Sequence, residues 1–143
     1  MKQFSHSKLQ MYERCPLQYK LRYSTRLKPV RGDTIEAFMG KCVHGALELL
    51  YRDLLKTKVN SLTDLLKFYD ETWRVDWDDE IKITNNDYNK EHYYNLGRKC
   101  IENYYNKYAP FDQDQTLGEE KKISLEWGEY EIIGVIDRLT REK

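Results

Sequence analysis

The segment of residues 119–138 constrains the fold of this chain most, because its pattern is that of a β-hairpin. Polar and apolar side chains alternate in residues 122–127, and a two-residue link that contains Gly128 follows. Residues 130–139 form a second and more apolar run. Two such runs, rich in β-branched and aromatic residues and joined by a short glycine-containing link, predict two antiparallel strands.

The second strand of this hairpin is expected to lie in the middle of a sheet. Residues 132–136 carry no polar side chain, a pattern typical of strands that are covered on both faces. Asp137 follows directly, at the predicted end of the strand. Because a carboxylate is costly to bury without a partner, we expect Asp137 to face a cation, which is Arg138, a lysine or a metal ion.

Helices are expected before the hairpin, over residues 8–14, 17–24, 35–57, 61–76 and 87–108. Gly40 and Gly45 interrupt the longest of them, and glycine inside a helix costs about 1 kcal/mol relative to alanine. Two such glycines indicate either close packing or a functional demand.

The chain of 143 residues is long enough for one domain, in which residues 1–110 are helical and residues 116–140 form the hairpin. Two strands rarely form a stable sheet alone. We therefore expect an α/β fold, α+β within these residues, and we expect the chain to be the front part of a longer domain.

Cysteine content and hydropathy restrict the environment of the protein. Three cysteines at unrelated spacings argue against a disulfide framework, and we therefore expect a reducing, cytoplasmic location. No apolar run approaches the roughly 20 residues that a membrane span needs, so no membrane association is expected. Cys42 and Cys100 fit core positions of helices.

The net charge of zero conceals a strong asymmetry. Residues 1–31 contain eight lysines and arginines against a single acid, Glu13, whereas six acids crowd between Asp70 and Glu80. A basic N-terminal quarter is typical of a surface that binds a phosphate backbone, and equally of a solvated helical face.

Four side chains could carry chemistry: His44, Glu119, Glu120 and Asp137. A histidine nitrogen with carboxylate oxygens suits magnesium or manganese better than zinc, which would require more nitrogen or sulfur ligands. Taken alone, a histidine in the setting of His44 is more often a hydrogen-bonded core residue, and an aspartate like Asp137 is more often a partner of Arg138 or Arg141.

Three motifs, in order along the chain, resemble RecB-like nuclease domains of the PD-(D/E)XK superfamily. They are Ser5-x-Ser7-x-x-x-Met11-Tyr12-x-x-Cys15-Pro16-x-x-Tyr19-Lys20-Leu21-x-Tyr23, then Gly40-x-x-x-His44-x-x-Leu47-Glu48, and finally Glu120-Lys121-Lys122-Ile123 with Gly134-Val135-Ile136-Asp137-Arg138-Leu139. Together they span nearly the whole chain. The resemblance implies N-terminal helices packed on the first strands of a restriction-endonuclease-like central sheet.

The resemblance also implies a DNA nuclease of the exonuclease type that depends on Mg²⁺ or Mn²⁺ and acts in DNA repair, recombination or CRISPR adaptation. It implies that DNA, single-stranded or at its ends, is the substrate and that a helicase is a possible partner. It assigns roles to six residues: His44 and Asp137 as metal ligands, Asp137 and Glu120 as catalytic acids, and Arg14, Lys20 and Arg22 as contacts to the DNA backbone.

The sequence departs from the family pattern after Arg138, because the expected Asp/Glu-x-Lys strand does not follow. We therefore expect this chain to be inactive alone and to need the missing C-terminal half of the domain. Some relatives hold an iron–sulfur cluster through a cysteine at the position of Cys15 and three others beyond these residues. We expect no cluster here, and we interpret Cys15 as a buried thiol at a helix junction.

Two alternatives remain open at this point. The chain could be a non-catalytic DNA-binding or scaffold module that has kept the fold and the basic face. It could also be a helical interaction domain whose opposite charges drive self-association.

Overall fold

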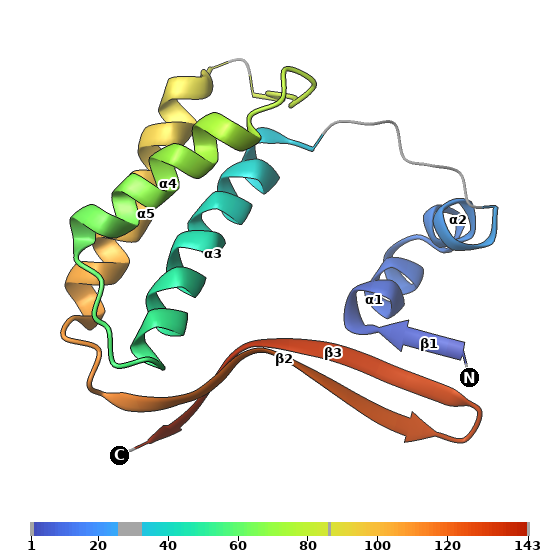
Figure 1. The fold of residues 1–143 in the computed structure, drawn as a ribbon. Helices are drawn as coiled ribbons and strands as arrows, with labels where there is room; N and C mark the ends of the chain where they lie inside the picture. The colour runs from blue at the N-terminus through green and yellow to red at the C-terminus, as the bar shows by residue number, and fades with distance from the viewer. Residues whose placement is uncertain (1, 26–32, 86, 143) are drawn as a thin grey trace. The chain divides into compact units, whose positions relative to one another are not determined.

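The computed structural model describes residues 2–25, 33–85 and 87–142 (Figure 1). The helices and strands in chain order are β1 (Lys2–Ser5), α1 (His6–Arg14), α2 (Pro16–Tyr19), the π-helix η1 (Lys20–Ser24), α3 (Ile35–Leu54), α4 (Leu62–Asp76), α5 (Lys90–Tyr108), β2 (Asp114–Trp127) and β3 (Tyr130–Glu142). This is an α+β fold with a three-stranded sheet, consistent with a restriction-endonuclease-like domain, as predicted.

The chain divides into two compact units. The first, the sheet unit, comprises residues 1–31 and 120–138, and the second, the helical unit, comprises residues 32–119 and 139–143. No helix in the described part of the chain has the length and hydrophobicity that crossing a bilayer requires.

The sheet has the strand order β1-β3-β2, so β3 lies in the middle, as predicted. The hairpin is confirmed, with its link at Gly128, whose φ of 60° is a left-handed conformation that glycine adopts without strain. The neighbour on the other side, β1, was not predicted. It runs parallel to β3, with Lys2 opposite Tyr130 and Ser5 opposite Ile133.

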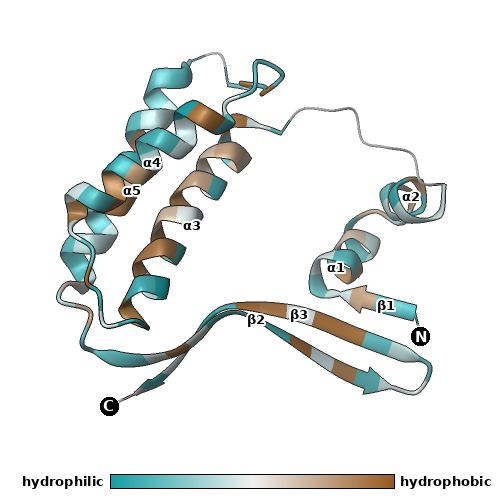
Figure 2. Cartoon of the chain, in the orientation of Figure 1, coloured by the Kyte–Doolittle hydropathy of each residue, from teal (hydrophilic) through white to brown (hydrophobic). Residues whose placement is uncertain are grey.

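Two expectations about β3 are wrong. Hydrophobic residues do gather along its middle (Figure 2), but Ile133 and Val135 are 36% and 52% exposed, so one face of the strand is open. Asp137 does not follow the strand but lies within it, because β3 extends to Glu142. Backbone pairing with β2, which begins at Asp114, continues the ladder past the apolar residues.

The N-terminal helices begin at His6 and Pro16, two residues and one residue before the predicted starts. The Ser5 hydroxyl accepts a hydrogen bond from the Lys8 backbone N–H at 3.3 Å and caps α1, and Pro16 opens α2. Cys15 lies between these helices but is only half-buried, contrary to prediction. Its Sγ accepts a hydrogen bond from the Gln18 N–H at 3.4 Å, which keeps the thiol at the helix end rather than in a core.

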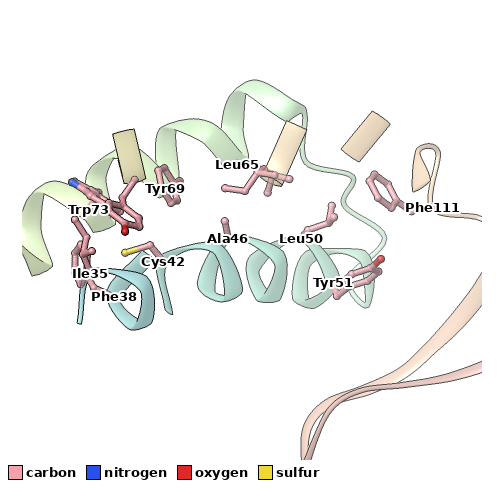
Figure 3. Packing of buried hydrophobic residues seen from close by; sticks show 12 residues of the cluster. Ile35, Phe38, Cys42, Ala46, Leu50, Tyr51, Leu65, Tyr69, Trp73 and Phe111 are labelled. Atoms are coloured by element: carbon pink, nitrogen blue, oxygen red, sulfur yellow. The ribbon is translucent and has the colours of Figure 1, made fainter. Parts of the chain in front are cut away.

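The helical unit is a bundle of α3, α4 and α5, and each helix has a side-chain cap at its start. Thr34, Ser61 and Asn89 accept hydrogen bonds from backbone N–H groups in the first turns of α3, α4 and α5, respectively. The buried core is built mainly from α3 and α4 (Figure 3), and its members are Ile35, Phe38, Cys42, Ala46, Leu50, Tyr51, Leu65, Tyr69, Trp73, Tyr93, Ile101 and Phe111.

The cysteines and glycines of this bundle differ in part from expectation. Cys42 is buried as predicted, but Cys100 is exposed, because the core face of α5 is formed by Tyr93, Gly97 and Ile101. Gly40 is not in close packing, since a Cβ atom there would meet nothing within 4 Å. The close approach of helices occurs instead at Gly97.

A small polar network links the last turn of α3 to the residues that follow it. The buried carboxylate of Asp53 accepts hydrogen bonds from Lys58 Nζ at 2.7 Å and from Asn60 Nδ2 at 3.0 Å. These two donors, Lys58 first, hold the pKa of Asp53 below its ordinary value. A lowered pKa means that the native state favours the charged form of Asp53.

Acid should therefore weaken this network. A carboxylate with a lowered folded-state pKa contributes stability above its unfolded pKa of about 3.9, and this contribution is lost as pH falls through the folded-state value. We expect the melting temperature of Asp53→Asn to fall less than that of the wild type when pH drops from about 5 to about 3. Exposed Asp112 provides the control, and an Asp112→Asn variant that shows the same flattening would contradict this role for Asp53.

Candidate metal centre

Two carboxylates predicted to share a site do lie together in the sheet unit. Glu120 on β2 and Asp137 on β3 each present an oxygen within 4.8 Å of the other, and both side chains are exposed. The hairpin explains this proximity, because it places residues far apart in sequence on adjacent strands. Glu119, the other glutamate considered, is half-buried and not part of this pair.

The backbone at Glu120 is unusual for a residue inside a strand. Its φ of 46° lies in the left-handed region, which non-glycine residues rarely adopt and which costs about 1 kcal/mol or more. A left-handed residue interrupts the regular alternation of side chains along a strand and redirects the side chain that it carries. Strained residues of this kind gather at functional sites, so the conformation of Glu120 supports a functional role for its carboxylate.

The electrostatics of the pair favour a cation. Two carboxylates at this separation repel each other, and an ion of opposite charge relieves the repulsion. Carboxylate oxygens are the ligands that Mg²⁺ and Mn²⁺ prefer. The chemistry of the donor set therefore fits the metal that the resemblance implied.

His44 is not the core residue that the alternative interpretation required. It is exposed on α3, while Phe38, Cys42 and Ala46 face the core of the helical unit. The nearby thiol of Cys42 is no competing ligand, because burial and the charge of Asp76 raise its pKa to about 11 and keep it protonated. His44 thus presents its imidazole away from the bundle core.

The predicted DNA contacts lie in the sheet unit. Arg14 ends α1, and Lys20 and Arg22 lie on η1, all three with exposed side chains. Of the other five cations of the basic N-terminal quarter, Lys2 and Lys8 also lie in this unit, whereas Arg26, Lys28 and Arg31 fall outside the described residues.

Sequence reasoning missed one feature of this site, the left-handed backbone of Glu120. The pattern of residues 119–123 shows no glycine or asparagine that would have signalled it.

The sheet also carries a hollow of about 400 Å³ beside the hairpin, lined by Gln3, Lys122, Ile123, Ser124, Glu131, Ile133, Gly134 and Val135.

Comparison with known proteins identifies the family. The family model described as the PD-(D/E)XK nuclease superfamily matches residues 3–143. Neither a search of curated proteins nor a search of solved structures found a significant match. The family model covers nearly the whole chain and agrees with the α+β fold. The chain therefore belongs to the PD-(D/E)XK nuclease superfamily.

Proposed function

We propose that this chain forms the metal-binding part of a DNA nuclease, with Asp137, Glu120 and His44 as ligands of Mg²⁺ or Mn²⁺. The observation that carries the proposal is the carboxylate pair of Glu120 and Asp137, held within 4.8 Å by two adjacent strands. Membership of the nuclease superfamily supplies the substrate class and the bond to be broken, the phosphodiester.

The residues of the chain would divide the work as follows. Asp137 and Glu120 would bind the ion through their oxygens, and the exposed imidazole of His44 would add a nitrogen ligand. A bound divalent ion supplies Lewis acidity and charge neutralisation for the cleavage of a phosphodiester. Arg14, Lys20 and Arg22 would hold the phosphate backbone by charge-assisted hydrogen bonds.

We expect metal binding without hydrolysis from these 143 residues alone. The sequence after Asp137 contains no Asp/Glu-x-Lys pattern, so a second acid and a lysine for the reaction would have to come from elsewhere. Exonuclease action, a preference for single strands or ends, a helicase partner, a role in repair or CRISPR adaptation and a cytoplasmic location stay predictions from the sequence.

The exposed cations Arg14, Lys20 and Arg22 also fit a second candidate, a non-catalytic DNA-binding module. Such a module would keep the basic N-terminal helices and bind DNA with a steep dependence on salt. It would not need the carboxylate pair, so the two candidates differ in metal binding.

Titration with Mn²⁺ by calorimetry tests the proposal. We expect Asp137→Asn to weaken Mn²⁺ binding about tenfold or more, because changes even around metal ligands cost about 10- to 100-fold in affinity. Glu126→Gln is the matched control, since Glu126 is an exposed carboxylate on the same hairpin. Equal Mn²⁺ affinities for the wild type and both variants would contradict the proposed metal site and favour the non-catalytic DNA-binding module.

A further inference from the structure

Three tyrosines of the N-terminal helices form a contiguous ring cluster. The ring centroids of Tyr12 and Tyr19 lie 5.3 Å apart, and those of Tyr19 and Tyr23 lie 5.0 Å apart. We call Tyr12, Tyr19 and Tyr23 the tyrosine cluster. It connects α1, α2 and η1, which follow one another along residues 6–24.

The tyrosine cluster is not a buried core. None of α1, α2 and η1 contains a buried residue, and Tyr12 and Tyr23 remain 55% and 39% exposed. By contrast, Tyr69 of the helical unit is completely buried. Ring faces that stay open to solvent can accept another flat apolar group.

A lysine lies beside the tyrosine cluster, and further cations lie on the helices that carry it. Lys8 Nζ lies 5.1 Å from the centre of the Tyr23 ring and 4.5 Å from that of Phe4. Arg14, Lys20 and Arg22 are exposed on the same helices, and Glu13 is the only acid within residues 2–25. The surface therefore combines aromatic rings with positive charge.

We infer that the tyrosine cluster is a stacking platform for the bases of single-stranded DNA, which deepens the proposed function and rests on its assumption that the chain acts on DNA. Proteins that bind single strands combine a positive surface for the backbone with aromatic side chains on which bases stack. In a duplex the bases are already stacked on one another, so their faces are not available to an aromatic ring of the protein. The cations would thus serve both forms of DNA, whereas the tyrosine rings would serve the single strand alone.

Fluorescence anisotropy with a labelled oligothymidylate of about 16 nucleotides, the upper site size of one single-strand-binding domain, tests this inference. The same length of duplex DNA is the second probe, and both are measured in EDTA so that no metal contributes. We expect Tyr12→Ala and Tyr23→Ala each to weaken single-strand binding by about five- to a hundredfold, the range known for loss of one stacked base. Duplex binding should change by less than about twofold, because phosphate contacts remain.

Two further variants separate stacking from folding. Tyr12→Phe keeps the ring and should bind the single strand like the wild type. Leu17→Ala removes an apolar side chain, 63% exposed, from α2, which also carries Tyr19, and should also bind normally. Arg22→Gln should weaken binding of both probes, and circular dichroism confirms that each variant is folded.

Two results would overturn the inference. They are an equal loss of binding to single strand and duplex in Tyr12→Ala, and a loss of single-strand binding in Leu17→Ala as large as that in Tyr12→Ala. Because these assays contain no metal, their failure leaves the Mn²⁺ titration of Asp137→Asn unaffected. A failed titration would likewise leave the single-strand preference standing.

Discussion

Replacing Gly97 with alanine is expected to lower the free energy of unfolding by about 1–3 kcal/mol, the usual cost of overpacking a core. A Cβ atom at this position of α5 would lie 2.8 Å from Cζ of Tyr69 and 3.1 Å from Cγ of Met39. The Tyr69 ring cannot easily move away, because it is completely buried and its hydroxyl donates a hydrogen bond to the carbonyl oxygen of Tyr94 at 3.2 Å. Urea denaturation followed by circular dichroism measures the loss.

Gly40→Ala is the matched control for this prediction. Gly40 also lies inside a helix, but its added Cβ would meet nothing within 4 Å. Alanine there should raise stability by up to about 1 kcal/mol, through helix propensity alone. Tyr69→Phe, which removes the hydroxyl nearest to the new methyl group, should recover part of the loss in Gly97→Ala. If Gly97→Ala is as stable as Gly40→Ala, α5 does not pack on Tyr69 as described.

The second large effect concerns the response of the protein to metal. A ligand that binds only the native state at about 100 times its dissociation constant adds about 2.7 kcal/mol to stability. We expect Mn²⁺ at that excess to raise the melting temperature of the wild type by several degrees. In His44→Ala, a hundredfold weaker affinity at the same Mn²⁺ concentration would remove most of this increase, because each tenfold loss corresponds to about 1.4 kcal/mol.

His92→Ala is the control for the response to metal. His92 is also an exposed histidine on a helix, α5, and it is not one of the proposed ligands. Its ring stacks on that of Tyr88, with the centroids 4.0 Å apart. Its variant should keep the full Mn²⁺-dependent increase in melting temperature. A His44→Ala variant that responds to Mn²⁺ like the wild type would exclude His44 from the ligands, whatever its stability without metal.

The elements that the sequence predicts well are those fixed by local chemistry. Ser5 and Thr34 cap helices because their side chains accept hydrogen bonds from nearby backbone N–H groups. Pro16 opens α2 because its ring fixes φ at a helical value and it has no N–H that would need a partner. Gly128 likewise marks the hairpin link because few other residues adopt its backbone conformation. Each of these signals acts within a few residues, so no knowledge of the rest of the fold is required.

The features that the sequence does not predict depend on residues distant in the chain. Strand β1 has four residues with a single large apolar side chain, and only pairing with β3 makes it a strand. The importance of Gly97 depends on where Tyr69 lies, and the proximity of Glu120 to Asp137 depends on the register of the hairpin. The exposure of His44 follows from which face of α3 the other helices cover, which periodicity alone did not decide.

The position of β2 at the rim of the described sheet has a consequence for how this surface behaves. With β3 on one side, the opposite rim of its 14 residues offers a row of backbone donors and acceptors. Leu125 and Trp127 near its end are 64% and 72% exposed and flank the exposed Glu126, so this end of the strand presents apolar side chains with one charge between them. Another extended segment can add to such an edge strand through main-chain hydrogen bonds alone, without any specific side-chain contact.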